Sequence, residues 1–282
     1  MRPTRRLLGP LLPLTLVPAA LLALSPAALA EPAQTRTGTE VVAHRGASGD
    51  APENTLAAVD EAVAQQADSI EIDVQRTADG HLVLLHDSTL ARTTDVEQVF
   101  PGRALDPVAG FTLAELKRLD AGSWFDPGFA GERIPTFAEL VEHTGDRAGL
   151  LVELKEPATY PGIEKEVAAE LGAPRPGAVV QSFDHDAMRR FAEAAPDVPA
   201  GWLFEARPTD AQLDDAVATG VDQINPSFRA TDADLVDTVR ARGMQTGVYT
   251  VDEEADMRRM LDANVDRIIT NHPGVLRGVL AG

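Results

Sequence analysis

Charged side chains collect at the ends of three short apolar segments that are typical of β-strands. They are His44 and Arg45 after the first segment, Glu71 and Asp73 within the second, and Glu153 and Lys155 at the end of the third. Side chains two residues apart on a strand point to one face, so Glu71 and Asp73 lie on the same face of their strand. Burying several carboxylates together is costly unless a cation neutralises them. The pattern therefore predicts a bound metal ion.

Simpler interpretations of the same residues stay open. A Glu-x-Asp pair occurs by chance on many exposed strands. Glu153 and Lys155 could form a structural ion pair inside the protein. Three such groups at the ends of successive strands favour the metal site over these alternatives.

A histidine is expected beside the Asp73 carboxylate. Asp79-Gly80 is a strong hairpin turn signal between the segments 69–75 and 82–86. With a two-residue loop, Arg76 faces Val83 and Asp73 faces His86. Residues that face each other share a face of the sheet, so His86 is expected at the metal site. The alternative is a histidine that only caps the strand end at the surface.

The elements that would position these residues alternate between strand and helix. Expected strands cover residues 41–44, 69–75, 149–155, 178–183, 200–204, 223–225, 245–250 and 267–271. Expected helices lie near 55–66, 136–144, 162–171, 184–194, 209–219, 231–242 and 253–263, with a last one after Pro273. Eight strands, each followed by a helix, predict a (β/α)8 TIM barrel, because a doubly wound open sheet usually has five or six strands.

One stretch interrupts this alternation. Residues 88–132 contain only one helical-looking segment, 112–119, among glycines, prolines and aromatic residues. The stretch falls after the second strand, so we expect a small insertion near the mouth of the barrel.

The first thirty residues have the composition of a cleaved export signal. They hold a basic start, an apolar run and a small-x-small cleavage sequence, namely Arg2, Arg5 and Arg6, residues 7–24, and Ala28-Leu29-Ala30. Prolines interrupt the apolar run and no later stretch is long enough to span a bilayer, which argues against a membrane anchor. The Arg5-Arg6 pair weakly indicates twin-arginine export. We expect a signal peptide at 1–30, a tether at 31–40 and a secreted barrel at 41–282.

Composition excludes several classes of partner and site. The chain has 44 acidic against 25 basic residues, a formal net charge of −19. Such a surface repels nucleic acid and anionic lipid headgroups, and we expect no stable membrane insertion after signal cleavage. There is no cysteine, so disulfides, cysteine-zinc sites and thiol nucleophiles are excluded. The exported protein must therefore depend on its apolar core.

Five short motifs in order resemble those of the glycerophosphodiester phosphodiesterase family. They are His44-Arg45-Gly46-Ala47, Pro52-Glu53-Asn54-Thr55, Glu71-Ile72-Asp73-Val74-Gln75, His86-Asp87 and Glu153-Leu154-Lys155. The resemblance extends from Val41 to Pro273. It implies a (β/α)8 barrel that hydrolyses small glycerophosphodiesters to sn-glycerol 3-phosphate and an alcohol.

The resemblance also implies a role for each matching residue. The metal would be bound by Glu71, Asp73 and Glu153, with Glu53 as a further ligand or as support for the ligands. The acid–base pair would be His44 and His86, and the phosphate oxygens would be held by Arg45 and Lys155. The walls of the pocket would include Trp124 and Tyr249. The ligands are oxygens only, which suits hard divalent cations. We expect Ca²⁺ in preference to Mg²⁺, because Ca²⁺ is abundant outside the cell and tolerates irregular carboxylate geometry. Zn²⁺ would need a histidine ligand.

The sequence departs from the family pattern at two places. It has Tyr249-Thr250-Val251-Asp252 where the family often has Trp-Thr-Val-Asn, and Thr270-Asn271-His272-Pro273 where the family commonly has Thr-Asp-x-Pro. These changes affect the expected substrate pocket more than the expected reaction.

Two other functions stay open, as does the first nucleophile. A phospholipase C- or D-like enzyme would need exposed aromatic residues for the bilayer, yet aromatics are only 5% of the chain. A non-catalytic metal- or phosphate-binding exported protein would be expected to lack one of the two histidines. Water and the glycerol 2-hydroxyl are both possible as the first nucleophile.

Overall fold

The computed structural model describes residues 38–172 and 175–282. The expected export signal and most of the expected tether lie outside the described residues. The first strand, β1, begins at Glu40, one residue before the expected start of the barrel. None of the helices in the described part of the chain is long and apolar enough to cross a bilayer.

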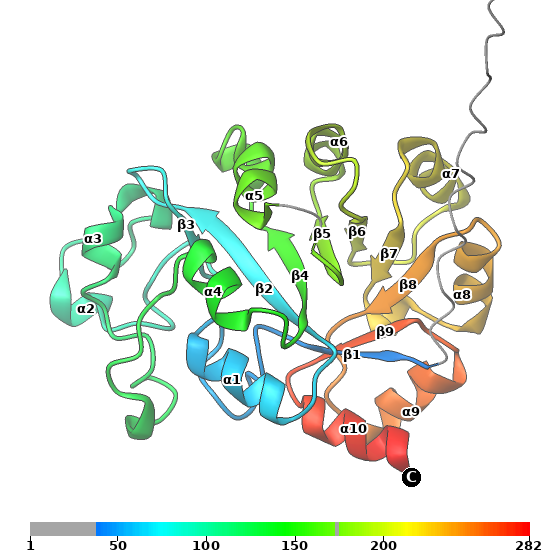
Figure 1. Ribbon diagram of the computed structural model, residues 1–282, viewed down its shortest axis with the longest axis horizontal. Coiled ribbons are helices and arrows are strands. Elements are labelled where there is room, and N and C mark those ends of the chain that lie inside the picture. The colour runs from blue at the N-terminus through cyan, green and yellow to red at the C-terminus, as the bar shows by residue number, and fades with distance from the viewer. Residues whose placement is uncertain (1–37, 173–174) are drawn as a thin grey trace, which may run out of the picture. The chain divides into compact units, whose positions relative to one another are not determined.

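Eight parallel strands close into a barrel, which confirms the predicted (β/α)8 fold (Figure 1). They are β1 (Glu40–Ala43), β2 (Ser69–Arg76), β4 (Gly149–Leu154), β5 (Ala178–Ser182), β6 (Ala200–Phe204), β7 (Gln223–Pro226), β8 (Gln245–Val248) and β9 (Arg267–Thr270). The first strand decides between a barrel and an open sheet. Because β1 pairs in parallel with both β2 and β9, the sheet has no free edge among these eight strands.

Helices lie outside the strands, as Figure 1 shows for α5 to α10. The barrel helices are α1 (Leu56–Ala64), α4 (Phe137–Thr144), α5 (Ile163–Leu171), α6 (His185–Ala194), α7 (Asp210–Thr219), α8 (Ala233–Arg240), α9 (Glu254–Asp262) and α10 (Pro273–Ala281). Side-chain caps fix several of their starts. Thr136 and Thr209, for example, each accept a hydrogen bond from a backbone N–H inside the first turn, in a capping box. α4 and α7 therefore begin directly after their capping threonines.

The stretch that interrupts the alternation packs around its own apolar cluster. It holds the short elements α2 (Val96–Val99), η1 (Val108–Gly110), α3 (Leu113–Leu116) and η2 (Pro127–Phe129), and Figure 1 shows α2 and α3 beside β3 (Leu82–Leu84). Phe111, Leu116 and Leu119 are fully buried in this cluster. Two further 3₁₀ turns, η3 (Pro157–Thr159) and η4 (Phe228–Ala230), follow β4 and β7.

The predicted register of the β2–β3 hairpin is wrong by one residue. The structure pairs Gln75 with Val83 and Arg76 with Leu82, so Asp73 does not face His86. The loop has three residues instead of two, because Thr77 pairs with His81 and Gly80 takes a positive φ of 87°. This combination of a turn followed by a left-handed glycine is the usual three-residue hairpin. β3 ends at Leu84, and His86 lies beyond the strand in the following loop.

Candidate active site

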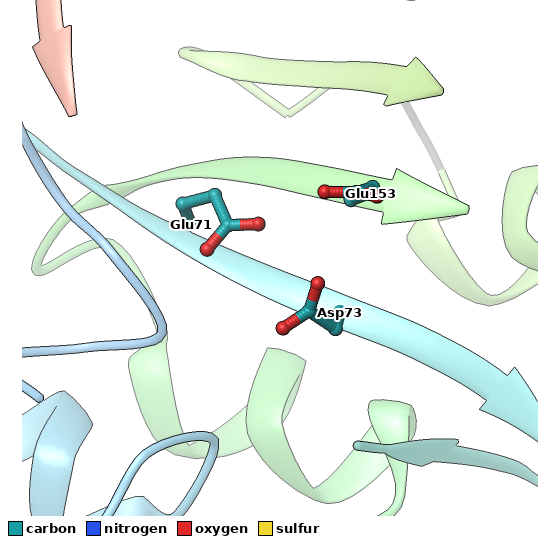
Figure 2. A group of neighbouring side chains, drawn as sticks. All are labelled: Glu71, Asp73 and Glu153. Carbon is teal, nitrogen blue, oxygen red and sulfur yellow. The ribbon is translucent and has the colours of Figure 1, made fainter. Parts of the chain in front are cut away.

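Three buried carboxylates meet inside the barrel, as Figure 2 shows. Glu71 and Asp73 come from β2 and Glu153 comes from the neighbouring β4, where the register places Asp73 beside Glu153. One oxygen from each lies within 4.8 Å of the others. Their exposed fractions are 2%, 1% and 9%, respectively. The structure thus brings together the three residues expected to bind a metal.

Two cations partly neutralise this carboxylate cluster. Lys155 Nζ donates to Glu153 Oε1 at 2.7 Å and lies 3.7 Å from Asp73 Oδ1. Arg45 Nε lies 3.2 Å from Asp73 Oδ2, and the backbone N–H of Arg45 donates to Glu71 Oε2 at 2.9 Å. Glu153 and Lys155 therefore form the ion pair that is the simpler alternative to a metal site. That ion pair does not account for the buried Glu71 carboxylate.

The pKa values show that the charges of the cluster are unbalanced. Burial raises the pKa of Glu71 well above its ordinary value, and the charges of Asp73 and Glu153 raise it further. Burial and the Asp73 charge also raise the pKa of Glu153. Burial alone would raise the pKa of Asp73, but Arg45 and Lys155 outweigh it and lower that pKa. The protein without a further cation disfavours the fully ionised cluster.

The donor set fits a divalent cation. Asp73 Oδ1 is buried and accepts no hydrogen bond, although the other oxygen, Oδ2, accepts one from Asn54 Nδ2 at 2.8 Å. A buried carboxylate oxygen without a partner is costly, and a metal ion would satisfy it. The cluster offers oxygens only, which suits Ca²⁺ or Mg²⁺.

The loop between β1 and α1 places Arg45 over the cluster by an unusual backbone path. Arg45 and Gly46 have consecutive positive φ values of 57° and 82°. A Cβ atom on Gly46 would come within 2.6 Å of the Ala58 backbone in α1, so only glycine fits there. The loop bends back at this point, and the Arg45 N–H faces Glu71.

His44 lies on the β1 side of the cluster. Its Nδ1 is 2.7 Å from Asn271 Oδ1, and its Nε2 is 4.0 Å from Glu71 Oε2. Burial, together with the nearby Arg45 charge, lowers the pKa of His44 to about 4. The ring is therefore uncharged at neutral pH.

His86 reaches the same end of the barrel despite the corrected register. Its Nδ1 is 2.7 Å from Asp87 Oδ1, and its positive form is close enough to lower the pKa of Asp73. His86 also lines a cavity of about 580 Å³ together with Glu153 and Lys155. The loops after β3, β4 and β5 form the walls of this cavity.

This arrangement of two imidazoles, two fixed cations and a carboxylate cluster can hold an anionic ester and transfer protons. The sequence profile of the Glycerophosphoryl diester phosphodiesterase family matches residues 44–275. The chain belongs to this family. It is accordingly an enzyme, a glycerophosphodiester phosphodiesterase.

Relatives of this family match most of the chain. The glycerophosphodiester phosphodiesterase of Bacillus subtilis is 36% identical over 261 residues, 86% of this chain and 86% of that protein. The one of Caldanaerobacter subterraneus subsp. tengcongensis is 38% identical over 242 residues, 84% of this chain and 96% of that protein.

Solved structures of the family share the fold. A phosphodiesterase of Oleispira antarctica, described in complex with the product sn-glycerol-3-phosphate, gives a TM-score of 0.75 at 29% identity. The match covers 86% of this chain and 97% of that one. The glycerophosphodiester phosphodiesterase of Agrobacterium tumefaciens gives 0.70 at 30% identity, covering 86% and 100%.

Glu53 lies in an ion-pair network. Arg45 Nη1 donates to its Oε1 at 2.9 Å, and Arg92 donates to both of its oxygens at 2.7 Å. Arg92 also donates to Asp87, with 2.6 Å between Nε and Oδ2. Arg92 thus links the Arg45 loop to the partner of His86. Sequence reasoning missed Arg92, and no spacing signal marks it.

Asn54 was also missed, although it lies in a quoted motif. Its side chain accepts a hydrogen bond from the Asp73 N–H at 3.1 Å, while its Nδ2 donates to Asp73 Oδ2. Asn54 has a positive φ of 58°, a conformation that asparagine tolerates better than most residues. An asparagine directly after Glu53 was the available signal.

The two aromatic residues expected as pocket walls differ in their surroundings. Tyr249 donates from its hydroxyl to the Phe204 carbonyl at 2.9 Å and packs edge-on against Phe183, with 6.0 Å between ring centroids. Burial and the charge of Glu153 raise the Tyr249 pKa, so this ring lies near the cluster. Trp124 is 38% exposed in the insertion, where its Nε1 donates to the Ala121 carbonyl. Neither side chain lines the 580 Å³ cavity.

Proposed function

We propose that the chain is a secreted, divalent-metal-dependent enzyme that hydrolyses glycerophosphodiesters to sn-glycerol 3-phosphate and an alcohol. The observation that carries the metal requirement is the carboxylate cluster, in which the buried Asp73 Oδ1 accepts no hydrogen bond. The product is supported by the Oleispira antarctica relative, which is described with sn-glycerol-3-phosphate.

Formal charges support the presence of a metal ion. Three carboxylates against Arg45 and Lys155 leave one negative charge, and Arg45 is shared with a fourth carboxylate, that of Glu53. The cluster without a metal is therefore left with excess negative charge, which a divalent cation would offset.

Glu71, Asp73 and Glu153 would hold the cation, with Ca²⁺ favoured over Mg²⁺ because an exported protein meets abundant Ca²⁺. When bound, the cation supplies charge stabilisation to the phosphoryl oxygens. Arg45 and Lys155 bind the remaining phosphate charge at the mouth of the barrel. Glu53 and Arg92 keep the Arg45 side chain directed to the cluster.

The two histidines have different partners, and this supports different roles. His44 contacts a neutral amide, so it accepts the proton of the attacking oxygen at Nε2. His86 contacts the Asp87 carboxylate and lines the cavity together with Glu153 and Lys155. We therefore assign to His86 the transfer of a proton to the oxygen of the departing alcohol. Each transfer contributes about 10²- to 10⁴-fold.

Export rests on the sequence of residues 1–30. The mature enzyme is expected to begin at Glu31 and to be found outside the cytoplasm, with small-molecule esters as substrates. N-terminal sequencing of the protein recovered from the culture medium checks this. Recovered protein that still carries residues 7–24 would contradict it.

The activity is tested on the mature chain with a panel of glycerophosphodiesters, with and without chelator. Enzymatic assay of glycerol 3-phosphate measures the product, and His86→Ala measures contaminating activity. We expect activity that EDTA abolishes and that Ca²⁺ restores better than Mg²⁺. Full activity in excess EDTA would refute the metal requirement. Restoration by Zn²⁺ alone would instead indicate a histidine ligand.

A further inference from the structure

Asp252 and Asn271 form a closely paired contact between the loops that follow β8 and β9. The Asn271 backbone N–H donates to Asp252 Oδ1 at 2.9 Å, and Asn271 Nδ2 donates to Asp252 Oδ2 at 2.8 Å. Thr270 Oγ1 also donates to Asp252 Oδ1 at 3.2 Å. The sequence has Asp252 where the family pattern has asparagine, and Asn271 where the pattern has aspartate. The two exchanged residues are in direct contact, so the pair still consists of one amide and one carboxylate.

The contact continues to His44. Asn271 Oδ1 lies 2.7 Å from His44 Nδ1, and Ser48 Oγ also donates to this oxygen at 2.7 Å. Ser48 Oγ lies 2.7 Å from the His44 carbonyl as well. Three side chains therefore surround the Asn271 amide. Only the Asp252 carboxylate, which cannot donate, constrains which end of the amide faces it.

The Asp252 carboxylate fixes the direction of the bonds from Asp252 through Asn271 to His44. A carboxylate only accepts, so the NH₂ group of Asn271 must face Asp252. The amide oxygen then faces His44, and Nδ1 must carry the proton that is donated to it. In the neutral ring Nε2 is consequently without a proton, and this atom faces the cluster, 4.0 Å from Glu71 Oε2.

We propose that Asp252 and Asn271 are positioning residues, which together fix the ring orientation and the tautomer of His44 so that Nε2 is ready to accept a proton. The inference rests on the proposed role of His44. Neither residue touches the reacting atoms. Asp252 acts only through Asn271, and Asn271 acts only through the ring.

Variants that reverse the pair test this proposal. In Asp252→Asn, the new amide can also donate, so it no longer selects one orientation of Asn271. We expect kcat to fall about 10- to 100-fold with KM within about twofold, because the substrate contacts remain while the base is partly in the wrong tautomer. The double variant Asp252→Asn/Asn271→Asp keeps an acceptor beside Nδ1, now a carboxylate oxygen, and reverses the bond between the two residues. We expect it to recover kcat to within about threefold of the wild type.

A measurement that needs no substrate separates this inference from the proposed function. Long-range ¹⁵N NMR of histidine-labelled protein at neutral pH reports which ring nitrogen carries the proton, and His44→Gln identifies the signal among the six histidines. We expect an Nδ1–H tautomer in the wild type and in the double variant, and a mixture in Asp252→Asn. A wild-type Nε2–H tautomer, or a tautomer that is unchanged in Asp252→Asn, would overturn the proposal. The expected tautomers in a protein without phosphodiesterase activity would refute the function and leave the positioning intact.

Asp222→Asn is the matched control. Asp222 accepts a hydrogen bond from the Ala200 backbone N–H at 2.9 Å, as Asp252 does from Asn271, but it lies before β7, at the opposite end of the strands. We expect its kcat and its His44 signal to equal those of the wild type. A kcat loss in Asp222→Asn as large as that in Asp252→Asn would show that loss of any such carboxylate is sufficient, and the proposal would fail.

Discussion

Replacing Glu71 by glutamine should stabilise the metal-free protein. Glu71 is buried beside two other carboxylates, and unit charges 4.8 Å apart repel by about 3.5 kcal/mol at an effective dielectric constant of about 20. Protonation limits this penalty. Since the ordinary pKa is 4.5, protonating Glu71 at pH 7 costs about 3 kcal/mol, which is the ceiling of the gain from an uncharged glutamine. We expect Glu71→Gln to raise the free energy of unfolding in EDTA by about 1–3 kcal/mol, because the glutamine is uncharged and its oxygen keeps the hydrogen bond from the Arg45 N–H.

The sign of this effect should depend on pH and on Ca²⁺. The folded-state pKa of Glu71 is raised, so the wild type keeps its full stability below the unfolded-state value of 4.5 and loses it as the pH rises. The advantage of Glu71→Gln should therefore shrink towards zero near pH 4.5. Saturating Ca²⁺ should reverse the order of stability. Ca²⁺ at 100 times its Kd raises the free energy of unfolding by about 2.7 kcal/mol. The variant gains less from Ca²⁺, because it has lost one of the three carboxylates that would bind the ion.

Thermal or urea unfolding at several pH values, with EDTA or with Ca²⁺, measures both effects. The matched control is Glu164→Gln, which removes another buried carboxylate whose partner is a single cation, Arg190, at 2.6 Å. That change should destabilise the protein, and it should leave the effect of Ca²⁺ unaltered. If Glu71→Gln destabilises the EDTA-treated protein as Glu164→Gln does, the carboxylate cluster is balanced without a metal and the reasoning is refuted.

Three further predictions concern activity. Glu153→Ala should weaken metal binding, and excess Ca²⁺ should partly restore the activity of the variant. No recovery of activity at any Ca²⁺ concentration would exclude Glu153 as a metal ligand. His86→Ala should lower kcat about 10²-fold or more with little change in metal affinity, and the double variant with His44→Ala should be barely worse. Near-normal turnover in a folded His86→Ala protein would defeat the two-histidine mechanism. Arg92→Ala should lower kcat about tenfold by freeing Asp87, and added guanidinium should recover part of the loss, whereas a purely structural role would give reduced stability without this rescue.

The barrel and the carboxylate cluster were predictable because their signals are local. Each strand is a short apolar run, and the two-residue spacing of Glu71 and Asp73 fixes their common face in any register. The neighbouring strand then supplies Glu153 without further information. Parallel pairing in a barrel leaves little freedom once the order of the strands is known.

The hairpin register was not predictable, because a tertiary contact selects the turn. Asp79 Oδ1 accepts hydrogen bonds from Thr77 Oγ1 at 2.7 Å and from the Leu113 N–H at 2.9 Å, and Leu113 belongs to the insertion. These bonds favour the three-residue loop over the two-residue loop that Asp79-Gly80 alone indicates. A one-residue change of register would normally move every side chain to the other face. His86 still reaches the site only because β3 ends two residues before it.

Three residues to which sequence reasoning assigned no role in the site share a physical property, namely Arg92, Asn271 and Asp252. Each lies in a loop far along the chain from the group it helps to orient: 39 residues separate Arg92 from Glu53, and 227 separate Asn271, which Asp252 holds, from His44. Their side chains orient the charged groups and do not form the cluster. Spacing along one strand therefore identifies the residues that meet a ligand, whereas the residues that orient them follow only from how the loops pack.

The partners of the two histidines come from different loops at the barrel mouth, and they differ in chemistry. The carboxylate beside His86 is its neighbour Asp87, which Arg92 holds in place. The amide beside His44 comes from the loop after β9, and its carboxylate lies one residue further away. A carboxylate placed behind an amide fixes the direction of that amide, and so favours one defined tautomer of the neutral ring. The place of Asp252 behind Asn271 thus supports the proposed role of His44 as the proton acceptor.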